Sequence, residues 1–307
     1  MLDFVLTQCI LRENESGKIG KGKMMNRKMD LWDSSRGCGS YMTAFLLPSI
    51  TPRPAVLVIP GGGYSCVCEK TEGPPAALAF NRLGFHAFVL NYRVAPNRFP
   101  APLEDAVRAV KIIRAHAEEW KIIPDRIVSC GFSAGGHLAG ALGLLQEPQH
   151  GCAGDRYDEV SGKINAMILS YGVLVHAPWS HTGSWKSLTG GDEALAEYCS
   201  LERKITGDTP PAFVWATMRD QAVDCRNSLV FAEAMLAAGR PCELHLYPYG
   251  DHGMLLGLGT LDVINWPAAA KSFLETQWAM QTDPDGTRQK YTHRYQCQAE
   301  IDAGLAV

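Results

Sequence analysis

The chain has 307 residues, a formal net charge of −3 and 46% hydrophobic residues, which is the composition of an ordinary globular protein. It carries no basic stripe for nucleic acid or a membrane surface and no apolar run of transmembrane length, so we expect neither kind of partner. Ten cysteines without a CxxC pair indicate reduced thiols in a cytoplasmic protein and no metal site.

Residues 1–28 differ in pattern from the rest and are predicted to form a flexible leader. Gly17 to Lys23 have the spacing G-x-x-x-x-G-K of a phosphate-binding loop. The next residue is Met24, where magnesium coordination requires Ser or Thr, and no helix pattern follows. We therefore interpret this stretch as a basic leader, in which Met24, Met25 and Met29 offer alternative initiation sites, and not as a signal peptide.

From about residue 40 the chain alternates between strand and helix patterns. The expected strands cover residues 41–47, 54–59, 85–92, 126–130, 164–171, 211–217 and 242–248. The expected helices cover residues 73–83, 103–120, 136–142, 228–238 and 267–280. A polar, Gly-rich insertion at 172–209 contains a short helix pattern near 192–200.

This alternation predicts an α/β fold with a doubly wound, mainly parallel β-sheet flanked by helices. The last strand alternates as a half-covered edge strand does. No internal repeat or low-complexity linker divides the regular part, so we expect a single domain over residues 29–282, followed by a polar tail at 283–307.

The central motif is Gly131-Phe132-Ser133-Ala134-Gly135, which joins an expected strand to an expected helix. A G-x-S-x-G sequence at such a junction predicts a nucleophile elbow, a sharp turn that exposes a serine. A β-carbon at either glycine would collide with the neighbouring strand or helix. The motif predicts Ser133 as a nucleophile, the alternative being a plain turn that contains a serine.

A nucleophilic serine needs oxyanion donors and a base. Gly61-Gly62-Gly63 follows a buried strand, so the N–H groups of Gly62 and Gly63, with that of Ala134, are the predicted donors. The predicted base is His252, which follows the last strand between two glycines. His137 lies one helical turn beyond Ser133 and is interpreted as structural.

The acid that orients the base is predicted in the loop after residues 211–217, which contains Asp220 and Asp224. We favour Asp220 because it is nearer the strand end. The order Ser, Asp, His along the chain is that of hydrolase sheets.

These residues resemble those of the α/β-hydrolase esterases, in the BD-FAE-like or acetyl-xylan-esterase-like branch related to hormone-sensitive lipase. The resemblance covers residues 29 to 280 and rests on Leu57–Tyr64 (LVIPGGGY), Leu90–Pro96 (LNYRVAP), Phe99–Asp105 (FPAPLED), Cys130–Leu138 (CGFSAGGHL), Thr209–Trp215 (TPPAFVW) and Glu243–Gly250 (ELHLYPYG). It implies a Ser-Asp-His triad, no cofactor, and a small-molecule ester as substrate, often an acetyl group on a sugar such as xylan.

Two positions depart from the family pattern. Pro60 replaces the histidine that precedes the glycines in the lipase-like branch, and Asp224 replaces a proline in the acid loop. Asp105 matches an acidic position that we expect to fix a helix start rather than to react. The predicted function is a serine carboxylesterase for short acyl esters; the alternatives are a prolyl-oligopeptidase-like peptidase and a non-catalytic binding protein.

Overall fold

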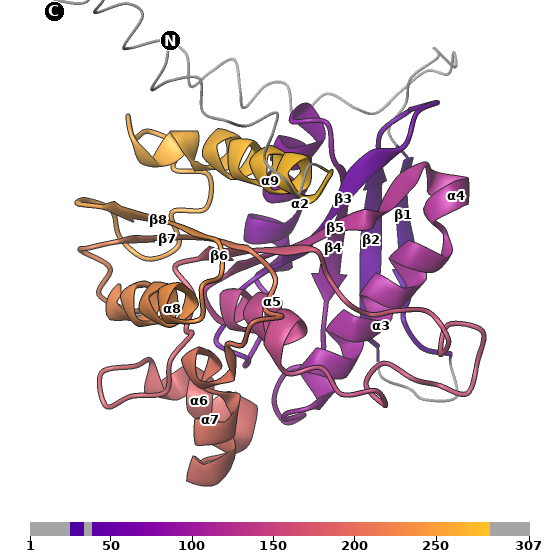
Figure 1. Ribbon diagram of the computed structural model, residues 1–307. Helices are drawn as coiled ribbons and strands as arrows, with labels where there is room; N and C mark the ends of the chain where they lie inside the picture. Colours follow the sequence, from indigo (N-terminus) through magenta and orange to yellow (C-terminus); the bar gives the residue numbers. More distant parts are fainter. Residues whose placement is uncertain (1–24, 34–38, 283–307) are drawn as a thin grey trace, which may run out of the picture.

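The computed structural model describes residues 25–33 and 39–282 of the chain. Eight strands form one sheet in the order β1-β2-β4-β3-β5-β6-β7-β8 (Figure 1). In chain order they are β1 (Met25–Asp30), β2 (Tyr41–Leu46), β3 (Arg53–Ile59), β4 (His86–Asn91), β5 (Ile122–Phe132), β6 (Ala166–Ser170), β7 (Ala212–Thr217) and β8 (Cys242–Tyr247). The β1–β2 and β2–β4 pairs are antiparallel and all later pairs are parallel, which confirms the predicted mainly parallel sheet, with β8 at one edge.

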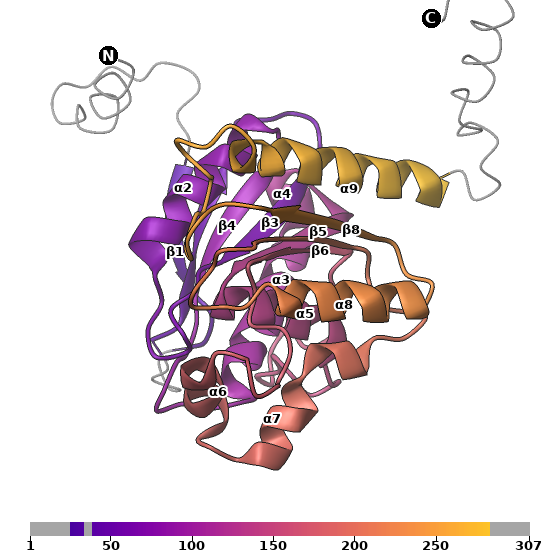
Figure 2. The same cartoon turned by 90° about the vertical axis from the view of Figure 1, so that its left-hand side faces the viewer.

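Helices cover both faces of the sheet (Figures 1 and 2). One face carries α2 (Glu69–Arg82) and α9 (Trp266–Thr282), and the opposite face carries α3 (Ala101–Ala115), α5 (Ala134–Leu144) and α8 (Arg226–Ala237). Beyond α5 lie α6 (Thr182–Thr189) and α7 (Glu193–Cys199), both from the insertion. Among the described residues, no helix is at once long enough and apolar enough to cross a membrane.

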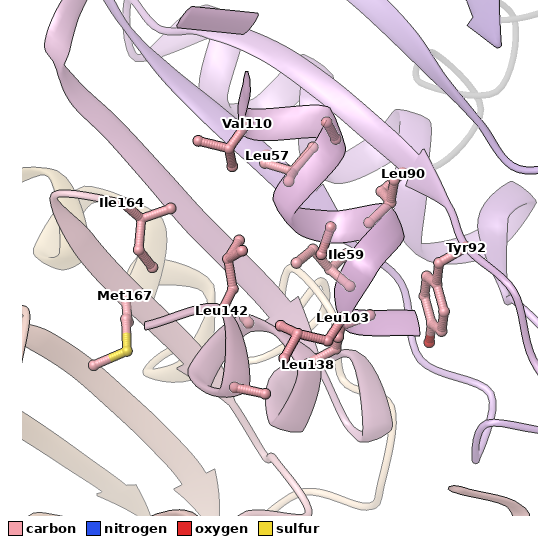
Figure 3. Close-up of a cluster of buried hydrophobic side chains, with 14 of the residues drawn as sticks. Leu57, Ile59, Leu90, Tyr92, Leu103, Val110, Leu138, Leu142, Ile164 and Met167 are labelled. Carbon is pink, nitrogen blue, oxygen red and sulfur yellow. The ribbon is translucent and has the colours of Figure 1, made fainter. Parts of the chain in front are cut away.

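The core has two parts because successive side chains of a strand point to opposite faces of the sheet. In β3, Leu57 and Ile59 belong to the cluster under α3 and α5, which Figure 3 shows, whereas Val56 and Val58 belong to the cluster under α2 and α9. All four side chains are fully buried. The continuous apolar run at 54–59 thus has the physical cause expected for a strand covered on both faces.

Several elements begin or end at other residues than predicted. The first strand, β1, includes residues 25–28 of the expected leader, whereas the loop-like spacing at 17–23 and the tail at 283–307 lie outside the described residues. The helix α2 begins at Glu69 rather than at 73, although Pro74 and Pro75 cannot donate within it. The carbonyls that lose these donors belong to the exposed residues Lys70 and Thr71, where water can satisfy them.

The expected helix at 103–120 is divided at His116 into α3 and α4 (Ala117–Trp120). There the His116 Nδ1–H donates to the Ile112 carbonyl at 2.9 Å. The insertion contains α6 as well as the expected α7. The N-terminus of α6 is capped by His181, whose Nδ1 accepts from the Ser184 amide. Histidine is not among the usual N-cap residues, so this helix start has no clear sequence signal.

Candidate active site

Ser133 lies on the turn between β5 and α5, with φ 55° and ψ −121°. A residue with a side chain rarely adopts positive φ, so the surrounding contacts must hold this conformation. The Ser133 amide donates to the Ser170 carbonyl at 3.0 Å, and its own carbonyl accepts from the Gly136 amide at 2.9 Å. The serine is therefore fixed between two strands and a helix start, with its side chain at the carboxyl edge of the sheet.

The two glycines of the motif are required by close packing. A β-carbon on Gly131 would collide with the carbonyl of Gly135, and one on Gly135 would collide with the carbonyl of Ile59 in β3. Both obstacles are backbone atoms, which cannot rotate away. The steric reason given for these glycines is confirmed.

His252 lies between Ser133 and Asp220, although the three residues come from loops after β5, β7 and β8. Its Nε2 is 2.8 Å from Ser133 Oγ, and its Nδ1 is 2.7 Å from Asp220 Oδ2. The other oxygen of Asp220 accepts from the amides of Ala222 and Val223 at 2.8 and 2.9 Å. Because the Asp220 side chain is only 1% exposed, these three donors replace the water that its carboxylate has lost.

The second acidic candidate, Asp224, makes different contacts. Its Oδ2 forms an ion pair with Arg226 at 2.6 Å, and its Oδ1 accepts from the Arg226 amide. The Arg226 guanidinium holds the pKa of the Asp224 carboxyl below its usual range. The structure thus brings Asp220, rather than Asp224, to His252.

The loop of Gly61 to Gly63 follows β3 at the same edge of the sheet. Gly62 has φ +126° and Gly63 has φ +63°, values that favour glycine, and a β-carbon on Gly62 would collide with the Cys66 carbonyl. Within the part of the chain that the structure describes, the amides of Gly62, Gly63 and Ala134 donate to no other protein atom. These N–H groups are therefore available to a ligand.

His137 is buried away from the Ser133 side chain. Its Nε2–H donates to the Cys199 carbonyl at 2.9 Å, so its Nδ1 accepts from the Tyr64 hydroxyl at 2.7 Å. Burial lowers the pKa of His137 to about 4. The neutral ring connects Tyr64, next to the glycine loop, to the end of α7.

One group of potential metal ligands is present in the insertion. His176, Glu193 and Glu197 place three ligand atoms within 4.8 Å of one another. However, each ring nitrogen of His176 faces a different carboxylate, Glu193 is 79% exposed, and Glu197 also pairs with Arg203. These contacts describe a surface ion-pair network, and we assign no metal to it.

Glu72 and Tyr171 lie at the site but have no place in the predictions. Glu72 accepts from the Gly61 amide at 2.5 Å, and the Tyr171 ring packs edge-on against His252 with centroids 5.1 Å apart. Tyr171 ends the expected strand at 164–171, and its place at the carboxyl end of a parallel strand could have indicated a role at the site. No sequence feature indicates such a role for Glu72, because the expected helix began one residue later.

Several known proteins are similar to this chain over most of its length. The profile of the family BD-FAE matches residues 47–235. The chain is 36% identical over 230 residues to endo-1,4-beta-xylanase B of Butyrivibrio fibrisolvens, and 30% identical over 229 residues to an acetylxylan esterase of Xylanibacter ruminicola. These matches cover 73% and 72% of the chain but only 36% and 45% of the two relatives, so the chain spans less than half of each.

A solved structure is similar over most of its length. The acetyl ester-xyloside bifunctional hydrolase of Caldicellulosiruptor lactoaceticus is 36% identical, with a TM-score of 0.76, over 85% of this chain and 98% of that one. The fold is that of the α/β hydrolases, as the sequence predicts.

Proposed function

Because this chain belongs to the BD-FAE family, we propose that it is a serine esterase that hydrolyses short-chain acyl esters. The observation that carries the proposal is the hydrogen-bonded series Ser133, His252, Asp220, with donor–acceptor distances of 2.8 and 2.7 Å. Relatives named for acetyl ester hydrolysis support the reaction class.

The contacts of His252 define the proposed direction of proton transfer. An ionised Asp220 can only accept, so Nδ1 of His252 carries the proton and Nε2 offers a lone pair to the Ser133 hydroxyl. His252 takes the hydroxyl proton as Ser133 Oγ attacks the ester carbonyl, and Asp220 stabilises the imidazolium that forms.

The attack places negative charge on the carbonyl oxygen of the substrate. The unbonded N–H groups of Gly62, Gly63 and Ala134 are the proposed donors to this oxyanion. Collapse of the intermediate expels the alcohol, which takes the proton from His252. Water, activated by the same histidine, then hydrolyses the acyl-enzyme. These steps use only residues of this chain and require no cofactor.

Acetyl groups on sugars, xylan-type chains among them, are the proposed natural substrate. The insertion borders the glycine loop, since a β-carbon on Gly63 would stand 3.6 Å from Ser184 Oγ of α6. Trp185 is 5% exposed and packs against His137, so it cannot stack on a sugar. Two other aromatic residues of the insertion, half-buried Trp179 and exposed Tyr198, are the proposed candidates for stacking on a sugar.

The test is hydrolysis of a chain-length series of p-nitrophenyl esters and of acetylated xylo-oligosaccharides. We expect the highest kcat/KM for acetyl esters, and a loss of at least about 10⁴-fold in Ser133→Ala. A matched control is Ser129→Ala, which removes a serine of the same strand whose hydroxyl donates to the Ala139 carbonyl, and which should keep wild-type activity.

Two outcomes would contradict this function. Cleavage of a dipeptide panel without ester hydrolysis would indicate a peptidase. Failure of a fluorophosphonate to label Ser133, with no turnover of any ester, would indicate a binding protein.

A further inference from the structure

A buried carboxylate lies behind the loop of Gly61 to Gly63. Glu72, on α2, is 9% exposed, and its Oε2 accepts from the Gly61 amide at 2.5 Å. A β-carbon on Gly61 would stand 3.0 Å from Ser133 Cβ and 3.1 Å from this same oxygen. Glu72 thus contacts Gly61, which lies against Ser133 and precedes Gly62, the first proposed oxyanion donor, in the chain.

The second oxygen of Glu72 connects to the opposite side of the site. The Tyr171 hydroxyl is 3.3 Å from Glu72 Oε1 and accepts from the Leu255 amide, also at 3.3 Å. Since an amide can only donate, the single proton of the hydroxyl is free to point at Glu72. The series therefore runs from Leu255 through Tyr171 and Glu72 to Gly61.

Both ends of this series belong to loops that carry proposed catalytic groups. Gly61 precedes the oxyanion amides, and Leu255 comes three residues after His252. Tyr171 and Leu255 have positive φ, 38° and 49°, so both backbones need external contacts to hold their conformation. The Tyr171 ring also packs edge-on against the His252 imidazole.

We propose that Glu72 and Tyr171 are positioning residues. They hold the loop of Gly61 to Gly63 and the loop of His252 to Leu255 in their relative positions around Ser133. Neither touches the substrate; their effect passes through Gly61 and His252. The kinetic part of this inference rests on the proposed function, whereas the structural link between the loops does not.

A carboxylate suits this position better than its amide isostere. An ionised Glu72 only accepts, which matches donors on both sides. Burial raises the pKa of Glu72, and the Gly61 N–H, the Tyr171 O–H and positive charge on His252 oppose that rise. A glutamine could accept from Gly61, but its NH₂ group would then face the Tyr171 hydroxyl, whose proton would lose its acceptor.

The kinetic test compares Glu72→Gln, Tyr171→Phe and the double variant on p-nitrophenyl acetate. Each single change should lower kcat about 10- to 100-fold with KM within about twofold, because the reacting groups are misplaced. The double variant should lose no more than the worse single, since both break one link. Losses that multiply, or a change confined to KM, would overturn the proposal.

The matched control is Glu69→Gln on the same helix. Glu69 also accepts from a tyrosine, Tyr41 at 2.6 Å, and from Asn91 at 2.9 Å, but it does not contact the loops of the site. It should keep the wild-type kcat. A loss equal to that of Glu72→Gln would mean that α2 acts only through general stability.

Hydrogen exchange tests the link without using activity. In Glu72→Gln, amides at 61–64 and at 252–256 should both exchange faster, although Glu72 does not touch the second segment, whereas Glu69→Gln should change neither. If the amides at 252–256 keep their wild-type protection, the proposed connection between the two loops through Glu72 and Tyr171 is wrong. If Glu72→Gln does not fold, the test uses Tyr171→Phe, in which the amides at 61–64 must exchange faster than in the wild type. A wild type inactive on every ester would refute the proposed function, and exchange would still decide the link.

Discussion

Asp220 Oδ2 lies 2.7 Å from Nδ1 of His252, while Asp224, four residues later, is paired with Arg226. The two carboxylates of this loop therefore have separate tasks. Asp220 faces the imidazole from a buried position, and Asp224 lies before α8, where it binds the amide and guanidinium of Arg226. Their replacement should affect different properties.

Asp220→Asn should lower kcat/KM for p-nitrophenyl acetate by about 10³- to 10⁴-fold, because a side-chain amide can favour the wrong tautomer of His252. Asp224→Asn should change kcat/KM by less than about threefold, since it removes an exposed ion pair. Steady-state kinetics on both purified variants measures the contrast. Similar losses in the two variants would reject the assignment of Asp220 as the orienting acid.

The elbow glycines should be intolerant of a single methyl group. Gly135→Ala would drive a β-carbon into the Ile59 carbonyl, and the backbone of both β3 and α5 must then move. We expect a loss of about 3 kcal/mol or more in the free energy of unfolding, measured by urea denaturation.

Gly207→Ala is the control for this change. A β-carbon there has no other atom within 4 Å, and the residue has no positive φ, so stability should stay within about 0.5 kcal/mol of wild type. Equal stability of the two variants would show that the elbow can relax.

The sequence predicts most of this fold because its patterns are local. Strand runs such as residues 54–59 show in their apolar content that they are buried on both faces, and G-x-S-x-G at a strand-to-helix junction predicts the turn at Ser133. The position of each candidate directly after a strand then predicts that they share one edge, as Ser133, Asp220 and His252 do.

The rest depends on contacts between distant segments. Nothing near Glu72 in the sequence predicts its two partners, because Gly61 lies 11 residues before it and Tyr171 lies 99 residues after it. Likewise, the local sequence does not show that Asp220 reaches His252, 32 residues later, while Asp224 bonds Arg226 instead. Such pairings require the three-dimensional structure.

Stability should depend on pH through His137. Burial lowers its folded-state pKa from 6.5 to about 4, so the unfolded chain binds this proton more readily between those values. The contribution of His137 is therefore complete above about pH 6.5 and is lost as pH falls toward 4, by about 3 kcal/mol in total.

The comparison with His137→Asn isolates this contribution. Urea denaturation of both proteins from pH 7.5 to pH 4 should show the wild type losing its advantage as pH falls, because every other titrating group is shared. A stability difference independent of pH would mean that His137 titrates normally in the folded protein.

Asp105 should stabilise the start of α3 without taking part in the reaction. Its carboxylate is fully buried and accepts from Trp32 Nε1 at 2.6 Å and from the Arg93 amide at 2.8 Å, and Arg93 also forms an ion pair with it. Asp105→Asn would direct an NH₂ group at one of these donors and remove the partner of a charge, at a cost of about 3 kcal/mol.

The folded fraction of Asp105→Asn should keep kcat within about threefold of wild type, because Asp105 contacts none of Ser133, Asp220 and His252. The control Glu275→Gln breaks the exposed pair with Lys271 on α9 and should cost less than about 0.5 kcal/mol. Thermal unfolding and active-site titration, measured on the same samples, separate the two effects. A large fall in kcat per titrated site, with stability unchanged, would instead place Asp105 in the catalytic machinery.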